Sequence, residues 1–195
     1  MFEFTYFFSG KRKKFNNKSL KIAVNEMDDN TGIHKFHGHI SNWDIDEVTS
    51  MKGLFDNTYH FNQQLDWDTK NVTDMSNMFK GTYNFNQQLN LDTTNVTDMS
   101  NMFNGAHDFN QQLDWDTTNV TDMSNMFKNA GTFNQPLKLD TKNVTDMSNM
   151  FDRALKFNQP LIFNTQNVTN MNGMFCNANS FDKQLDFNTE QVTSM

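Results

Sequence analysis

The chain has 195 residues, of which 36% are hydrophobic and 20% are charged, with a formal net charge of −7. A composition this polar can indicate disorder, but 20 phenylalanines and 14 methionines recur at fixed positions, which argues for an ordered core. Residues 1–40 carry seven Lys/Arg and four Asp/Glu, which leaves nine and nineteen for residues 41–195. Because phosphate backbones are bound through Lys and Arg, this acidic excess excludes nucleic acid as the partner of residues 41–195.

Residues 1–18 form a basic leader, which we expect to be solvated and poorly ordered. Its apolar start is interrupted by Glu3, and the positive charges follow this start rather than precede it, so no secretory signal is expected. No stretch of the chain is long enough to cross a bilayer, and we expect no membrane insertion.

Residues 19–47 are predicted to form an N-terminal helical cap. Leu20, Ala23, Val24 and Met27 have the spacing of one apolar helix stripe, and Ser19 precedes them as an expected N-cap. A helix of about two turns with this stripe can cover the first copy of the repeat that follows.

Residues 48–195 repeat every 24 residues without an insertion or deletion, as six complete copies and the start of a seventh. A methionine column lies three residues after each of the valines that open the copies, and phenylalanine columns run from Phe55 to Phe175 and from Phe61 to Phe181. A fixed period this short predicts a solenoid, because one copy cannot close a core alone but can bury its apolar edge against identical neighbours. The opening valines are Val48, Val72, Val96, Val120, Val144, Val168 and Val192.

Each copy combines two patterns. Val72, Met75 and Phe79 lie on one stripe at helical spacing, and the column that contains Gly81 reads mostly Gly or Asn, the residues that tolerate a left-handed helix stop. Leu65 and Trp67 alternate with polar residues, as in a half-buried strand. The fold class predicted is an α/β solenoid in which each coil has one short helix and one short β-strand, with the strands of stacked copies paired in parallel.

The string DTKNVTDMSNMFDRALKFNQPL, from Asp140 to Leu161, resembles the repeats of the BspA-type leucine-rich repeat surface proteins. The resemblance covers Trp43 to Met195. It implies a right-handed, leucine-rich-repeat-like stack, a cell or virion surface location, and adhesion to host or matrix proteins.

The sequence shows no catalytic constellation, so we expect neither an enzyme nor a bound cofactor. His34, His37 and His39 offer possible metal ligands, but we expect exposed histidines in a loop. The column of aspartates that contains Asp68 could hold Ca²⁺, yet the favoured interpretation is an Asx-turn in which each carboxylate accepts the N–H two residues on. The single cysteine, Cys176, excludes an intramolecular disulfide.

Outward positions of the predicted strands form the candidate protein-binding face. Their second member varies among Asp, Asn, Lys and Ile beside nearly constant core columns, and repeat proteins acquire ligands through such variation. We expect a protein-binding scaffold for adhesion or recognition. The alternative is a structural protein that associates end to end through its C-terminal coil, or a fragment of a longer surface array. The face residues are Gln64, Asp66, Gln88, Asn90, Gln112, Asp114, Lys138, Ile162, Gln184 and Asp186.

Overall fold

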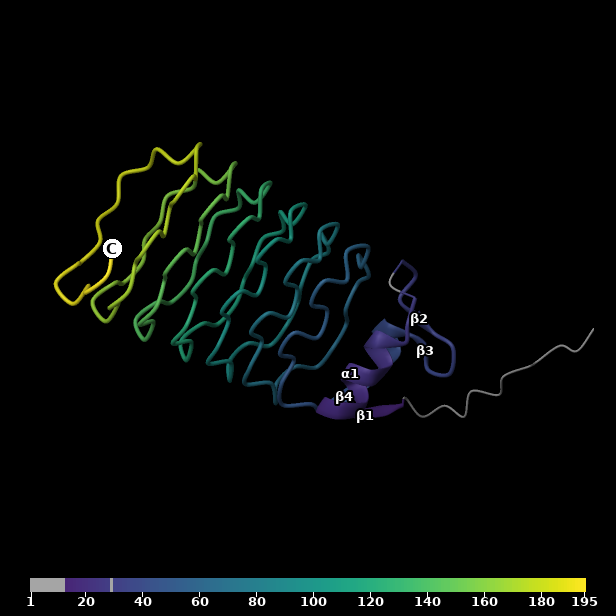
Figure 1. The fold of residues 1–195 in the computed structure, drawn as a ribbon. Coiled ribbons are helices and arrows are strands. Elements are labelled where there is room, and N and C mark those ends of the chain that lie inside the picture. The colour runs from purple at the N-terminus through teal and green to yellow at the C-terminus, as the bar shows by residue number, and fades with distance from the viewer. Residues whose placement is uncertain (1–12, 29) are drawn as a thin grey trace, which may run out of the picture.

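The computed structural model describes residues 13–28 and 30–195. Successive 24-residue copies lie side by side as coils of one stack, and all helices and strands of the described residues lie in a cap at its N-terminal end (Figure 1). We number the coils from 1, residues 48–71, to 6, residues 168–191. The predictions for residues 1–12, including the apolar start and the basic residues Lys11 and Arg12, lie outside the described residues.

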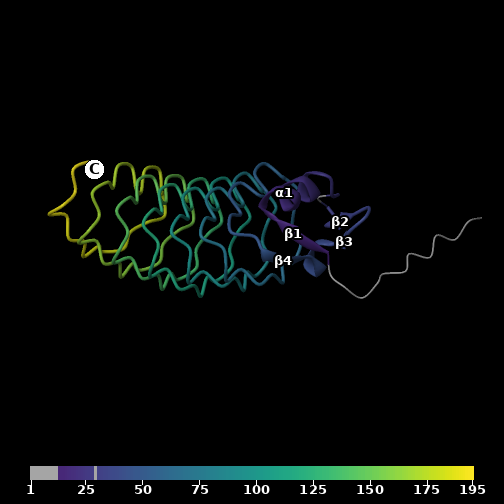
Figure 2. The same ribbon diagram turned by 90° about the horizontal axis from the view of Figure 1, so that it is seen from below.

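The cap consists of two small sheets and one helix. β1 (Lys14–Asn16) pairs in parallel with β4 (Asp44–Glu47), and β2 (Ile33–His34) pairs antiparallel with β3 (Gly38–His39), which leads into the 3-10 helix η1 (Ile40–Asn42). The cap lies against the first coil, and the remaining coils extend from it in line (Figure 2). Because β1 belongs to this unit, the cap begins within the predicted leader, ahead of the boundary at residue 19.

Helix α1 (Asn17–Asn25) begins earlier than the sequence pattern predicts. Asn16 is its N-cap, and Ser19 is the third residue of a capping box in which each side chain accepts the other's backbone N–H at 3.0 Å. The prediction of Ser19 as N-cap was therefore wrong. Asn16 and Ser19 are both good N-cap residues, and only the pairing of β1 with β4 fixes the residue at which the helix begins. The predicted apolar stripe is buried, including Met27 beyond the end of the helix.

The cap supplies hydrogen bonds that a preceding coil would supply. The Oδ1 atom of Asn17 accepts the N–H of Thr49 at 2.8 Å, whereas the N–H of Thr73 in the next coil donates to the carbonyl of Thr49. The ammonium of Lys21 donates to the carbonyls of Gly53 and Leu54. Burial lowers the pKa of Lys21, with Asp56 acting in the opposite direction. These contacts give hydrogen-bond partners to backbone groups on the edge of coil 1 that faces the cap.

The backbone ladder that joins the coils lies in the segment predicted to be helical. Every second N–H donates to a carbonyl in the next coil at 2.7–3.0 Å, and the N–H groups between them donate three residues back within their own coil. Isolated parallel bridges run through the same side of the stack, for example Asp74 with Asp98. In coil 1 the donors to coil 2 are Met51, Gly53, Phe55 and Asn57.

The helix predicted in each copy does not form, because a residue in its middle has a left-handed backbone. Asn77 has φ 58°, and all six members of its column have φ between 52° and 63°, which a right-handed α-helix cannot accommodate. Asn77 is the third residue of a turn closed by the N–H of Met78 and the carbonyl of Met75, where a type II turn requires positive φ. The second column, which contains Gly81, has the left-handed conformation predicted for it.

The strand predicted in each copy also differs from the structure. Residues 61–67 alternate between buried and exposed as expected, but within the described residues they form no backbone hydrogen bond to the next coil. Side chains bridge the coils instead: Asn62 Oδ1 accepts the N–H of Asn86 at 2.9 Å, and Thr69 Oγ1 donates to the carbonyl of Asp92 at 2.9 Å. The Phe61 column has ring spacings of 5.8–6.0 Å, against 5.4–5.7 Å in the Phe55 column, so the coils are wider apart where side chains intervene.

Two rows of phenylalanine rings form the centre of the core. Phe103 stacks on Phe109 of its own coil at 4.0 Å and on Phe79 and Phe127 of the neighbouring coils at 5.7 Å each. The valine, methionine and phenylalanine columns are buried through coil 5, which confirms that they form the interior. Because each ring contacts both neighbouring coils, the burial of one copy depends on the next.

Candidate interaction face

The predicted binding face lies along the extended side of the stack. All of its residues are exposed, and Ile162 retains 92% of its accessible surface although it is apolar. Leu161 and Phe163 on either side of it point inward and are buried. The alternation found in the sequence therefore gives the outward direction of these side chains correctly, even though no regular strand carries them.

The two members of each outward pair have different roles in the stack. In coils 1 and 2 the first member joins coils, since Gln64 Nε2 donates to the carbonyl of Gln88 and Gln88 Nε2 to that of Gln112, both at 2.9 Å. No hydrogen bond to a neighbouring coil is found at the second member in the described structure, as at Asp114 or Ile162. The second member is therefore free to vary without loosening the scaffold, and it determines the chemistry of the face.

Neighbouring asparagine and glutamine side chains hold the face flat against the core. Asn86 Oδ1 accepts the N–H of Asn110 at 2.9 Å and an Nε2–H of Gln111 at 2.9 Å. The same pattern continues at Asn134, where the N–H of Asn158 and the amide of Gln159 donate to Oδ1. These bonds satisfy backbone N–H groups that a β-ladder would otherwise satisfy.

The aspartate column at the end of the extended segment forms the Asx-turns that the sequence predicts. Asp68 Oδ1 accepts the N–H of Lys70 at 3.2 Å, and Asp116 Oδ1 accepts that of Thr118 at 2.9 Å. Hydrogen bonds from the side chain and backbone of Lys70 lower the pKa of Asp68, and the backbone of Thr118 lowers that of Asp116. One border of the face is therefore held negatively charged at neutral pH.

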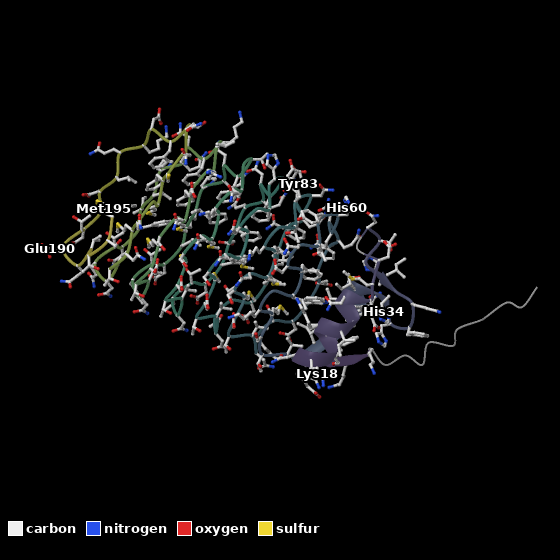
Figure 3. All side chains as sticks on the ribbon, viewed as in Figure 1. Lys18, His34, His60, Tyr83, Glu190 and Met195 are labelled. Atoms are coloured by element: carbon white, nitrogen blue, oxygen red, sulfur yellow. The ribbon has the colours of Figure 1, made fainter. Side chains whose placement is uncertain are left out.

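A column at the opposite border, not singled out from the sequence, carries exposed aromatic and aliphatic side chains. Tyr59, Tyr83 and Leu155 are its large exposed members, and Tyr83 is labelled in Figure 3. The ring of Tyr83 stacks on that of His107 with the centroids 4.6 Å apart. The signal in the sequence was the variability of this column, which reads Tyr59, Tyr83, His107, Gly131, Leu155, Asn179. Beside it lies a shallow polar hollow lined by Asn62, Asn84, Asn86, Asp108, Asn110 and Thr132.

The asparagine column, the possible metal ligands and the single cysteine were also placed by the structure. The asparagine before each Val-Thr pair from Asn71 to Asn167 is exposed and donates from Nδ2 to a carbonyl 25 residues earlier, as Asn95 does to Lys70 at 2.8 Å and Asn71 does to Asp46 of β4. Throughout residues 13–28 and 30–195, no three histidine, cysteine, aspartate or glutamate side chains gather in a metal-binding arrangement. Cys176 is a free, exposed thiol. No helix of the described part of the chain has the length and apolar character needed to cross a membrane.

The sequence and the geometry together define a protein of stacked 24-residue repeats behind an N-terminal cap. The chain belongs to the family described as Mycoplasma protein of unknown function, DUF285, whose model matches residues 22–138 and 112–195. Neither a curated protein nor a solved structure matches the chain.

Proposed function

We propose that the chain is a non-enzymatic protein-binding scaffold that acts in adhesion or recognition through the exposed outward face. The observation that carries this proposal is the variable second member of each outward pair, which is exposed and makes no bond between coils. A row of Asp66, Asn90, Asp114, Lys138 and Ile162 passes from acidic to basic to apolar along one face. Interfaces gain specificity from such a change of chemistry across a rigid surface.

The fold class proposed with this function is a right-handed, leucine-rich-repeat-like solenoid of the BspA type. The 24-residue register, the coil-to-coil hydrogen bonds and the continuous phenylalanine rows support it. The resemblance to BspA-type repeats further suggests a cell or virion surface location and host or matrix proteins as ligands. The absence of a recognisable catalytic constellation in the sequence supports a binding role rather than an enzymatic one.

The binding role is tested with a triple variant of the face, Asp114→Ser, Lys138→Ser and Ile162→Ser. Proteins of host-cell surface and matrix extracts that the immobilised chain retains are purified and measured singly by biosensor. We expect the triple variant to weaken binding by at least about tenfold, because loss of central interface side chains typically costs more than 1 kcal/mol.

A matched control changes three residues of the Asx-turn border in the same part of the stack, the half-buried Thr118 and the exposed Lys142 and Gln166, each to Ser. This variant should bind as the unchanged chain does. Equal binding by both variants would assign the interaction to another surface, and a chain that retains no protein specifically would contradict the binding role itself.

A second candidate function is end-to-end association through the C-terminal coil. Phe181, Leu185 and Phe187 are only half-buried, whereas coils 1 to 5 bury the same columns. The N–H groups of Gly173 and Phe175 have no partner within the described residues, although their equivalents in coil 5 donate to coil 6. Since this edge presents donors, the complementary surface is one that offers carbonyls in register, as another coil of the same repeat does.

Sedimentation analysis tests this association. If it occurs, the chain should form concentration-dependent oligomers, and Phe187→Asp should return it to the monomer by placing a charge on the apolar end. Ile162→Asp, which changes an exposed apolar residue on the side of the stack, should leave the oligomers unchanged. A monomer at high concentration, or an equal effect of both substitutions, would argue against end-to-end association.

A further inference from the structure

His34 and His37 of the cap stack on each other, and His34 is buried, whereas the sequence suggests an exposed loop. His34 in β2, labelled in Figure 3, is only 3% exposed. Its ring stacks on that of His37 with the centroids 4.2 Å apart and the planes at 11°. Trp43 meets both rings edge-on, at 6.0 Å from His34 and 6.2 Å from His37. Phe15 of β1 stacks on Trp43 at 4.8 Å. The sequence prediction failed because the covering aromatic residues come from distant parts of the chain.

Two hydrogen bonds fix the orientation of the His34 ring. Its Nδ1 atom accepts the backbone N–H of Phe36 at 3.0 Å, so Nδ1 carries no proton. The proton then lies on Nε2, which is 3.4 Å from Oε2 of Glu26 at the end of α1. Protonating Nδ1 would replace an N–H···N hydrogen bond by two opposed hydrogens, and the turn from β2 to β3 would lose this bond.

The charged groups around the pair do not offset a second positive charge. Lys13 precedes β1 and Lys35 lies over the ring of Phe36, while among residues 13–28 and 30–195 Glu26 is the acidic group that acts on His37. Burial lowers the pKa of His37, the charges of His34 and Lys13 lower it further, and the Phe36 backbone and Glu26 act in the opposite direction. Two imidazolium rings 4.2 Å apart would repel each other in a partly desolvated site.

We propose that the stacked imidazoles of His34 and His37 form an acid-sensitive latch, which holds the β2–β3 hairpin and Trp43 in place when the His37 ring is neutral and releases them when that ring is charged. The latch is joined to the repeat stack, since Trp67 of coil 1 donates from Nε1 to the carbonyl of Ile40, directly after the hairpin, at 3.0 Å. Its release therefore loosens the cap from the first coil and leaves the coils further along intact. This inference is independent of the binding face.

The pH dependence follows from the direction of the His37 shift. A pKa below the unfolded value of about 6.5 means that the folded cap prefers the neutral ring, so the stability that this ring contributes is complete above that value. The contribution is lost as the pH falls through the folded pKa. Each proton taken up on opening changes the opening equilibrium by up to about tenfold per pH unit.

Hydrogen exchange of the full chain, followed by mass spectrometry between about pH 7.5 and pH 5 and corrected for intrinsic exchange rates, tests the latch. Peptides from residues 30–45 should lose protection by about tenfold or more, while peptides from coil 4, residues 120–143, should keep theirs. His37→Phe retains an aromatic ring without a titrating group and should make the hairpin insensitive to pH. His60→Gln, which changes an exposed histidine of coil 1, is the matched control and should respond as the unchanged chain does.

A hairpin whose protection does not depend on pH, or a His37→Phe variant with the original pH response, would overturn the latch. If His37→Phe fails to fold, proton NMR titration of the histidine rings in the unchanged chain decides the matter. His37 must then titrate below the exposed His60, and the reverse order would overturn the proposal.

Discussion

Phe103→Ala should lower the free energy of unfolding by about 3–5 kcal/mol, the range for deleting a buried aromatic ring. Phe103 is fully buried in coil 3 and stacks on one ring of its own coil and on rings of both neighbouring coils. The coils cannot close the resulting cavity easily, because hydrogen bonds between their backbones fix the distance between them. Urea denaturation followed by circular dichroism measures the change.

Phe181→Ala is the matched control for that substitution. Phe181 occupies the second phenylalanine row in coil 6 and is half-buried, with ring partners at 4.4 Å in its own coil and 5.9 Å in coil 5. We expect a loss of about 1–2 kcal/mol, because less apolar surface returns to water. Equal losses at the two positions would contradict the view that each coil is stabilised by neighbours on both sides.

Lys128→Met should be the other strongly destabilising substitution, at about 2–3 kcal/mol. The ammonium of Lys128 lies 3.0 Å from Oδ2 of Asp152, which is a buried carboxylate. Removing one partner of a buried pair leaves the other charge desolvated and unpaired, which typically costs about 3–5 kcal/mol. We expect less here because the side chain of Lys128 keeps 29% of its exposure, so water can reach the remaining carboxylate in part.

The double variant Lys128→Met, Asp152→Leu separates the lost ion pair from the lost packing. It should recover most of the stability, because no charge is then left without a partner. As a surface control, Lys70→Met removes the partner of Asp68, but both side chains are about half exposed, so the free energy of unfolding should not change measurably. A double variant as unstable as Lys128→Met would show that packing, and not charge, causes the loss.

The pair also corrects an expectation from the sequence. The column of Asp56, Lys80, Asn104, Lys128, Asp152 and Cys176 is polar in five of six copies, which suggests that it faces water. Asp152 is nevertheless buried, and Lys128 is partly buried beside it. Side chains in one column lie on top of each other, so a long lysine in coil 4 covers the shorter aspartate in coil 5.

The left-handed column of Asn77 shows a sequence signal that was present and was missed. The column contains only glycine and asparagine, as does most of the Gly81 column, in which positive φ was correctly predicted. The spacing of Val72, Met75 and Phe79 favoured a helix, and the helix prediction placed Asn77 inside it. Asparagine alone does not stop a helix, but four asparagines and two glycines at one position of six copies indicate a required left-handed backbone.

The candidate face was easier to predict than the latch in the cap. Gln64 and Asp66 alternate with Leu65 and Trp67, and this local pattern gives the direction of each side chain. The burial of His34 depends on Phe15 and Trp43, which no local pattern connects to it. A contact between residues from separate elements cannot be read from the period of either element.

The sequence by itself determined the 24-residue register and the columns that are buried, because a hydrophobic side chain at a repeated position requires the same neighbour in every copy. The tertiary structure alone decided where the backbone hydrogen bonds go. The N–H of Phe55 donates to the carbonyl of Met78 in the next coil, whereas the segment that reads as a strand is joined by asparagine and threonine side chains. Two stacked coils can satisfy their polar groups with hydrogen bonds from the backbone or from side chains. The distance between the coils decides which of the two forms, and this distance is set by the packed rings and the left-handed turns.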